Sequence, residues 1–97
     1  MLDFILLTHN DSTSDPTPAM WTSYFATLNS KGIFEGGSSI GAGDTFRKDG
    51  SPGKLSESLV GYIRVRAKNL SEAREFLAGH PVFECGGTVE VRELPRG

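Results

Sequence analysis

The chain of 97 residues fits a single domain over residues 1–97, and its short length allows only a modest core. Its formal net charge of −2 gives no basic excess, which argues against nucleic-acid binding. The single cysteine, Cys85, excludes an internal disulfide and a multi-cysteine metal site. There is no transmembrane run and no recognisable signal segment, so we expect a cytoplasmic protein that does not associate with membranes.

The first expected element is a strand at residues 2–8, where four apolar residues in a row indicate a central strand buried on both faces. A polar turn follows, and either Asp15-Pro16 or Thr17-Pro18 supplies an N-cap and a proline at the first helical position. Over residues 19–31 the apolar side chains recur at helical spacing (Met20, Trp21, Tyr24, Phe25 and Leu28). This stripe predicts a helix that packs on a sheet and ends at Gly32.

The middle of the chain predicts a second strand at residues 33–41, kinked or bulged at Gly36-Gly37. A short third strand is expected at residues 44–47, before a loop rich in turn-forming residues. Alternating residues at 59–66 predict another strand, with Ile63 and Val65 on one face and the polar set on the other: Tyr62, Arg64 and Arg66.

The last part of the chain predicts a second helix, capped by Asn69 or Ser71 and ended by Gly79. Its inner stripe comprises Leu70, Ala73, Phe76 and Leu77. A closing strand is expected at residues 88–94, where Val89 and Val91 alternate with Glu90 and Arg92.

This order of elements predicts a ferredoxin-like α+β sandwich with both helices on one face of the sheet. The opposite face is then uncovered, and carries Tyr62, Arg64 and Arg66 with Glu90 and Arg92, or the complementary set. A chain this small has little else with which to cover that face. The simplest cover is the same face of a second copy, so we expect a homodimer.

Several motif matches fail on inspection. The glycine-rich stretch at residues 36–43 has Ala42 where a phosphate loop requires lysine, which favours structural glycines. The strand around Gly61-Tyr62 resembles an RNA-recognition strand, but Val60 and Arg64 stand where that motif needs a basic and an aromatic residue. RNA binding therefore remains a weak alternative. No spacing predicts a metal site, and no cofactor is expected.

His80 is the candidate for a catalytic or anion-binding role. A histidine near a loop often serves only as a hydrogen-bonded structural residue. The alternative is a general acid/base or an anion contact at the mouth of a cleft, with Glu84 orienting the imidazole.

The stretch from His80 to Pro95, with its proline, paired glycines and Val-Glu-Val-Arg strand, resembles the C-terminal signature of the YCII-related domain family. The Gly61-Tyr62 strand and the segment from Trp21 to Gly37 resemble further parts of that family, in the same order. The resemblance implies a dimeric α+β barrel with a small pocket near the sheet edge and the first helix. Some members are suspected enzymes with a histidine–aspartate pair in that pocket.

This sequence lacks the histidine–aspartate pair of those family members. Trp21 stands where those members carry histidine, and His80 stands where they carry aspartate. The D-G-P-F motif of the longer branch is absent. His80, Trp21 and Tyr62 remain at matching pocket positions.

Two hypotheses follow. In the first, a homodimeric YCII-like protein binds a small anionic or aromatic molecule near the dimer interface through Trp21, Tyr62, Arg64 and Glu84, with His80 as a possible catalytic residue. In the second, the chain is a structural or interaction module without catalysis. The sequence leaves open whether the protein is an enzyme.

Overall fold

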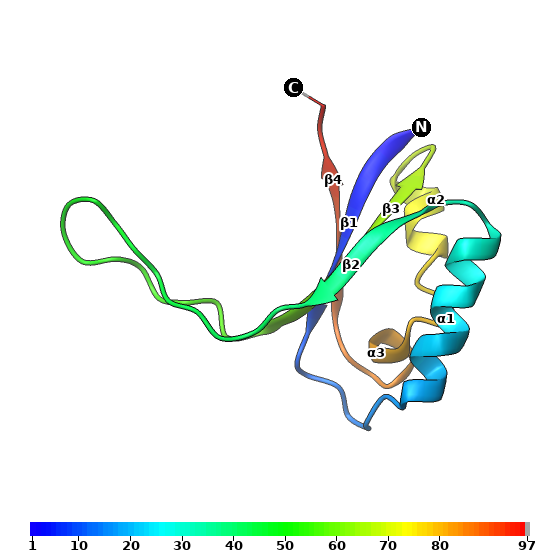
Figure 1. Cartoon of the computed structure of the whole chain (residues 1–97), viewed down its shortest axis with the longest axis horizontal. Helices are drawn as coiled ribbons and strands as arrows, with labels where there is room; N and C mark the ends of the chain where they lie inside the picture. Colours follow the sequence, from blue (N-terminus) through cyan, green and yellow to red (C-terminus); the bar gives the residue numbers. More distant parts are fainter. Residues whose placement is uncertain (97) are drawn as a thin grey trace.

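A four-stranded antiparallel sheet forms the base of the fold, and the computed structural model describes it within residues 1–96 (Figure 1). The strands lie in the order β2-β3-β1-β4. Their bounds are β1 (Leu2–His9), β2 (Phe34–Ser39), β3 (Leu59–Ala67) and β4 (Val89–Leu94). Together with the intervening helices, this order is that of a ferredoxin-like α+β fold, so the predicted fold class is confirmed.

The helices cover one face of this sheet (Figure 1). They are α1 (Pro18–Ser30), α2 (Leu70–Glu75) and the short α3 (Pro81–Glu84), which was not predicted. The Thr17 hydroxyl accepts a hydrogen bond from the Met20 N–H at 3.2 Å, so Thr17 rather than Asp15 is the N-cap of α1. Asn69 caps α2 in the same way, because its side chain accepts from the Glu72 N–H at 2.9 Å.

The core lies between this face and the helices. In the pairing of β1 with β3, Phe4 lies opposite Val65 and Leu6 opposite Ile63, and all four side chains are buried. From the helix side, buried side chains complete the same cluster, among them Tyr24, Leu28, Ala73 and Leu77. Burial of apolar surface on this one face is the main favourable contribution to folding.

The other face of the sheet carries no helix within residues 1–96, and we call it the open face. Ile5 and Leu7 of β1 point to it and are only half-buried, between Arg64 and Tyr62 of β3 and Arg92 and Glu90 of β4. This is the first of the two residue sets considered for this face. The prediction that β1 is buried on both faces holds only for the helix side of a single chain, because no second layer covers the open face.

Two predictions for the middle of the chain had different outcomes. The bulge is confirmed, since the pairing of β2 with β3 shifts register between Phe34 and Gly37. The short strand at residues 44–47 is wrong: among the described residues, 40–58 form no strand. The reason is that this segment runs away from the sheet and meets no strand with which to pair.

We call residues 40–58 the arm. In Figure 1 it is the green loop at the left, on the side of the sheet away from the helices. It lengthens the molecule to principal extents of 47 × 37 × 19 Å. No helix within residues 1–96 is long and apolar enough to cross a membrane.

Candidate functional site

A cavity of about 400 Å³ opens at the end of the sheet where β2 and β3 lead into the arm. Helix α1 supplies two aromatic side chains, Trp21 and Phe25. Thr8 and Ser39 bring hydroxyl groups from the helix side of the sheet. Tyr62 and Ser38 also border the cavity, but they lie opposite each other in the sheet and their side chains point to the other face. The remaining wall is made of small or aliphatic residues (Gly37, Val60, Gly61, Ile63 and Val82).

The aromatic wall follows from the way α1 lies on the sheet. Tyr24 and Leu28 on its stripe are buried, whereas Trp21 and Phe25 are only half-buried and border the cavity. The Trp21 and Phe25 rings stack with centroids 5.7 Å apart, and Phe25 in turn contacts Phe34 at 5.4 Å. Rings that support one another in this way form a fixed surface on which a further ring can pack.

Glycines shape the sheet side of the cavity. A Cβ at Gly37 would lie 2.5 Å from the Tyr62 carbonyl oxygen, so only glycine permits this close approach of β2 and β3. A Cβ at Gly61 would instead make an ordinary contact, 3.4 Å from the Ser38 carbonyl oxygen. Gly61 therefore leaves space in the wall that a methyl group could occupy without moving the backbone.

The lining has little charge. Within residues 1–96, no charged side chain borders this cavity. Aromatic rings, aliphatic groups and a few hydroxyls are the usual lining of a small-molecule pocket, in which a few polar groups fix the orientation of the ligand. Such a lining suits an uncharged ring with hydroxyl or carbonyl substituents better than an isolated anion, whose charge would be buried without a partner.

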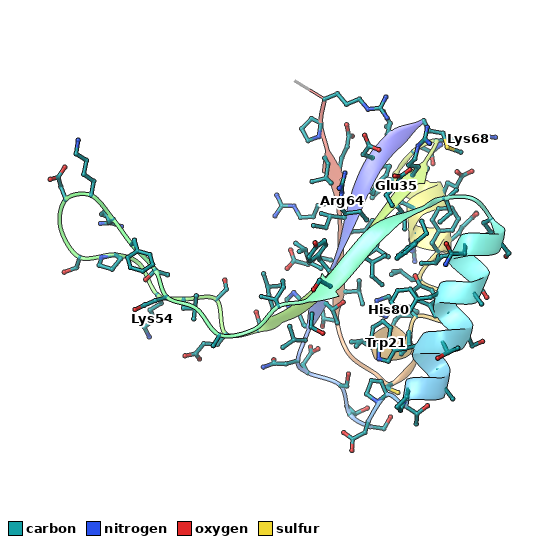
Figure 2. All side chains as sticks on the ribbon, in the orientation of Figure 1. Trp21, Glu35, Lys54, Arg64, Lys68 and His80 are labelled. Carbon is teal, nitrogen blue, oxygen red and sulfur yellow. The ribbon has the colours of Figure 1, made fainter. Side chains whose placement is uncertain are left out.

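His80 lies behind this wall rather than in it. Its side chain is fully buried, with its ring 5.3 Å from Trp21 in an edge arrangement and 5.0 Å from Tyr24. Figure 2 shows His80 and Trp21 side by side against α1. The histidine thus contacts the pocket only through residues that line it.

The protonation state of His80 follows from its hydrogen bonds. Its Nδ1 accepts a hydrogen bond from the Val82 N–H at 3.2 Å, which places the ring proton on Nε2. Nε2 has no partner among the described residues. Burial lowers the pKa of His80 from 6.5 to about 4, so the imidazole is neutral at physiological pH.

The remaining predicted site residues lie elsewhere. Arg64 projects from the open face, and Glu84 borders a separate shallow depression beside α2. The Glu84 carboxylate accepts a hydrogen bond from the Gly79 N–H at 2.8 Å, and the imidazole of His80 is oriented by Val82. Trp21 and Tyr62 thus both border the cavity, with the Tyr62 side chain on the open face and His80 behind Trp21, whereas neither Arg64 nor Glu84 reaches that cavity.

Sequence reasoning did not identify Phe25, Thr8 or Ser38 as pocket residues. Phe25 belonged to a stripe expected to be core, and Ser38 to a glycine-rich stretch tested only as a phosphate loop. The feature that brings these serines to the cavity is the pairing of β2 with β3, in which Ser38 lies opposite Tyr62 and Ser39 opposite Gly61. That register is available only from the structure. Within residues 1–96, no group of three His, Cys, Asp or Glu side chains is arranged to hold a metal ion.

Comparisons with known proteins bear on the fold. No protein-family model matches the chain. No curated protein matches it in sequence. Among solved structures it is similar to 5-chloro-2-hydroxyhydroquinone dehydrochlorinase from Burkholderia phenoliruptrix in complex with 2,5-dihydroxybenzoquinone, with a TM-score of 0.58 and 17% identity over 99% of this chain and 96% of that chain. At this identity the likeness supports the ferredoxin-like α+β fold predicted from the sequence, and the fold alone.

Proposed function

We propose that this chain is a homodimeric, YCII-related protein that binds a small aromatic or quinone-like ring in the cavity beside α1. One observation carries the proposal: Trp21 and Phe25 of α1 line a cavity that also presents hydroxyl groups and, within residues 1–96, no charged side chain.

The size and chemistry of the cavity support a ring as ligand. Its volume of about 400 Å³ falls within the range of roughly 300–1,000 Å³ common for small-molecule sites. Contact between aromatic rings contributes about 0.5–1.5 kcal/mol beyond the burial of area. The hydroxyl groups of Thr8 and Ser39 can each donate a hydrogen bond to a ring substituent or accept one from it. Of the two ligand classes predicted from the sequence, anionic and aromatic, the lining favours the aromatic one.

The ligand of the structural neighbour supports the proposed size of the bound ring. Its ligand, 2,5-dihydroxybenzoquinone, is a six-membered ring bearing hydroxyl and carbonyl oxygens, and it is held by a protein of the same fold. That compound is a vinylogous acid and therefore ionises at neutral pH. It is a useful probe here, because a pocket without charged lining should prefer an uncharged ring of the same size.

The homodimer is supported by surface that a single chain leaves exposed. The accessible surface is 6528 Å², against about 5,400 Å² expected for a compact monomer of 10.5 kDa. The radius of gyration is 14.8 Å, against about 12.5 Å expected for this length. The excess of about 1,100 Å² is comparable to the roughly 800 Å² that each partner buries in a standard stable interface.

His80 enters the proposal as a positioning residue that supports Trp21 and Val82 from behind. A role as general base would require a free ring nitrogen. Nδ1 already accepts a hydrogen bond, and Nε2 carries the proton. If a ring substrate proves to be turned over, a pH–rate profile that is unchanged in His80→Ala would exclude the catalytic role predicted from the sequence.

Isothermal titration calorimetry tests the ligand. We expect hydroquinone, which is uncharged at neutral pH, to bind at least tenfold more tightly than benzoate or 2,5-dihydroxybenzoquinone. Gly61→Ala should weaken binding by adding a methyl group to the wall, and Trp21→Ala should abolish it. Phe83→Ala, which removes an exposed ring outside the cavity, and Gly43→Ala in the arm are matched controls that should bind normally. If Trp21→Ala and Gly61→Ala bound hydroquinone as tightly as the two control variants, or if no ring bound at all, the result would contradict the proposal.

The alternative is a structural or interaction module in which the dimer surface is the function. The uncovered apolar residues of the open face favour it as far as assembly is concerned. A stable dimer whose cavity binds none of the three rings would support this alternative.

A further inference from the structure

The arm has little to hold it in place. Residues 40–58 form no helix or strand, and loops of this length without secondary structure are usually either functional or linker segments. Hydrogen bonds tie its base to the body, including Ile40 N–H to the Val60 carbonyl at 2.9 Å and Asn10 N–H to the Ser58 carbonyl at 2.9 Å. Farther out, the Thr45 hydroxyl donates to the Gly53 carbonyl at 2.6 Å and joins the two sides of the arm.

The arm carries an apolar side chain into solvent. Phe46 is 89% exposed, the highest value among the exposed large hydrophobic residues, and Ile40 and Leu55 are also exposed. The charges of the arm are balanced, with three acidic and three basic residues (Asp44, Asp49, Glu57, Arg47, Lys48 and Lys54). A phenylalanine in a neutral segment is a typical anchor for a protein surface, whereas nucleic acid would require a basic excess.

The direction of the arm identifies the surface it can reach. It extends on the side of the sheet away from the helices, which is the side to which the open face points (Figure 1). A protein seated on the open face would therefore lie beside the arm. The open face offers half-buried apolar residues (Ile5, Leu7 and Leu94) between basic and acidic side chains, so it can pair with its own copy.

We propose that the arm of each chain clasps a second copy seated on the open face, with Phe46 packed against the partner. This inference rests on the proposed homodimer and deepens it. In a two-fold dimer every contact occurs twice, with the roles of the two subunits exchanged. Each arm would therefore hold the other arm's subunit. The occupant is a second copy because the excess surface of about 1,100 Å² per chain lies in the range that a stable dimer buries.

Site-specific photo-crosslinking tests the clasp. We replace Phe46 with p-benzoylphenylalanine and, as a matched control, replace Phe83, an aromatic residue 47% exposed on the helix side. Irradiation at micromolar concentration should yield a covalent dimer from position 46 and none from position 83. Phe46→Asp should weaken dimerisation at least tenfold in sedimentation equilibrium, while Phe83→Asp should leave it unchanged.

A third variant separates failure of the clasp from failure of the dimer. Leu7→Asp places a charge in the middle of the open face and should abolish dimerisation, with folding checked by circular dichroism. If Leu7→Asp dissociates the dimer while position 46 gives no crosslink and Phe46→Asp has no effect, the clasp is wrong and the face-to-face dimer stands. If the wild-type chain is itself monomeric, clasp and homodimer both fail, and calorimetry of ring binding judges the pocket separately.

Discussion

The two faces of β1 differ in burial although both are apolar. Phe4 and Leu6 point to the helices and are almost completely buried, whereas Ile5 and Leu7, equally apolar and next to them in the chain, are half-buried on the open face. Adjacent strand residues point to opposite faces, so one apolar run serves both. The helix face stabilises the single chain, and the open face retains apolar surface that the proposed dimer would cover.

This difference shows how a small domain can divide its apolar residues between folding and assembly. A chain of 97 residues buries a limited share of its surface, and the core here comes from one face alone. The pocket lies at the end of the sheet beside α1, and its wall belongs partly to each region: Thr8 and Ile63 face the helices, and Tyr62 comes from the open face. The proposed dimer surface and the proposed ligand site are therefore physically adjacent.

The largest expected effect compares Leu6 with Leu7. Leu6→Ala should reduce the free energy of unfolding by about 2–5 kcal/mol, because it leaves a cavity in the packed core. Leu7→Ala should cost less than about 1 kcal/mol in dilute, monomeric samples and more where the dimer forms. Urea unfolding at two protein concentrations measures both. Equal costs in dilute samples would mean that the open face is already internal to one chain.

The buried imidazole gives the next effect. The pKa of His80 is about 4 in the folded chain and near 6.5 when unfolded, so the unfolded chain binds more protons between these values. Stability is therefore complete above pH 6.5 and falls as the pH drops from 6.5 to 4, by about 3 kcal/mol at roughly 1.4 kcal/mol per pKa unit. Thermal unfolding across this range measures it. His80→Phe should flatten the profile and Trp21→Phe should keep it; an unchanged profile in His80→Phe would place the acid sensitivity in other groups.

A glycine pair compares the sheet with the arm. Gly37→Ala should destabilise the fold by about 1–3 kcal/mol, because its Cβ would meet the Tyr62 carbonyl oxygen and force β2 away from β3. Gly43→Ala in the arm has no atom within 4 Å of its Cβ and should be neutral or slightly stabilising. Chemical denaturation distinguishes them. A neutral Gly37→Ala would show that β2 tolerates a wider separation from β3.

The smallest effect concerns an ion pair at the open face. Arg66 Nη1 and Glu35 Oε1 lie 3.5 Å apart with both side chains partly exposed, so Glu35→Gln should change stability by only about 0–1 kcal/mol in dilute samples. A double-mutant cycle with Arg66→Gln measures the coupling. The coupling should grow at concentrations where a partner excludes water from this face. A coupling that is independent of concentration would place the pair outside the interface.

The sequence predicted the fold well because each main element has a strong local pattern. The β1 run, the α1 stripe with its Thr17-Pro18 start, and the alternation of β3 all depend on neighbours in the chain. The strand at residues 44–47 failed because a strand needs a partner, which local propensity does not reveal. Helix α3 has four residues, too few for a periodic signal.

The site was less predictable. Trp21 and Tyr62 were selected through a family resemblance, and both line the cavity. Phe25 and Ser38 join them only because α1 crosses the sheet and β2 pairs in one register, neither of which the sequence specifies locally. His80 is next to the pocket in space, but its burial depends on packing against Trp21 and Tyr24 of α1, which are distant in the chain. Its tautomer is set locally by the Val82 N–H.

Sedimentation equilibrium of the wild-type chain at micromolar concentration tests the central claim most directly, namely that the open face is an assembly surface. The account predicts a mass twice that of the 10.5 kDa chain, falling to one copy on dilution or in Leu7→Asp. A folded chain that sediments as a single copy of 10.5 kDa at all accessible concentrations would contradict it.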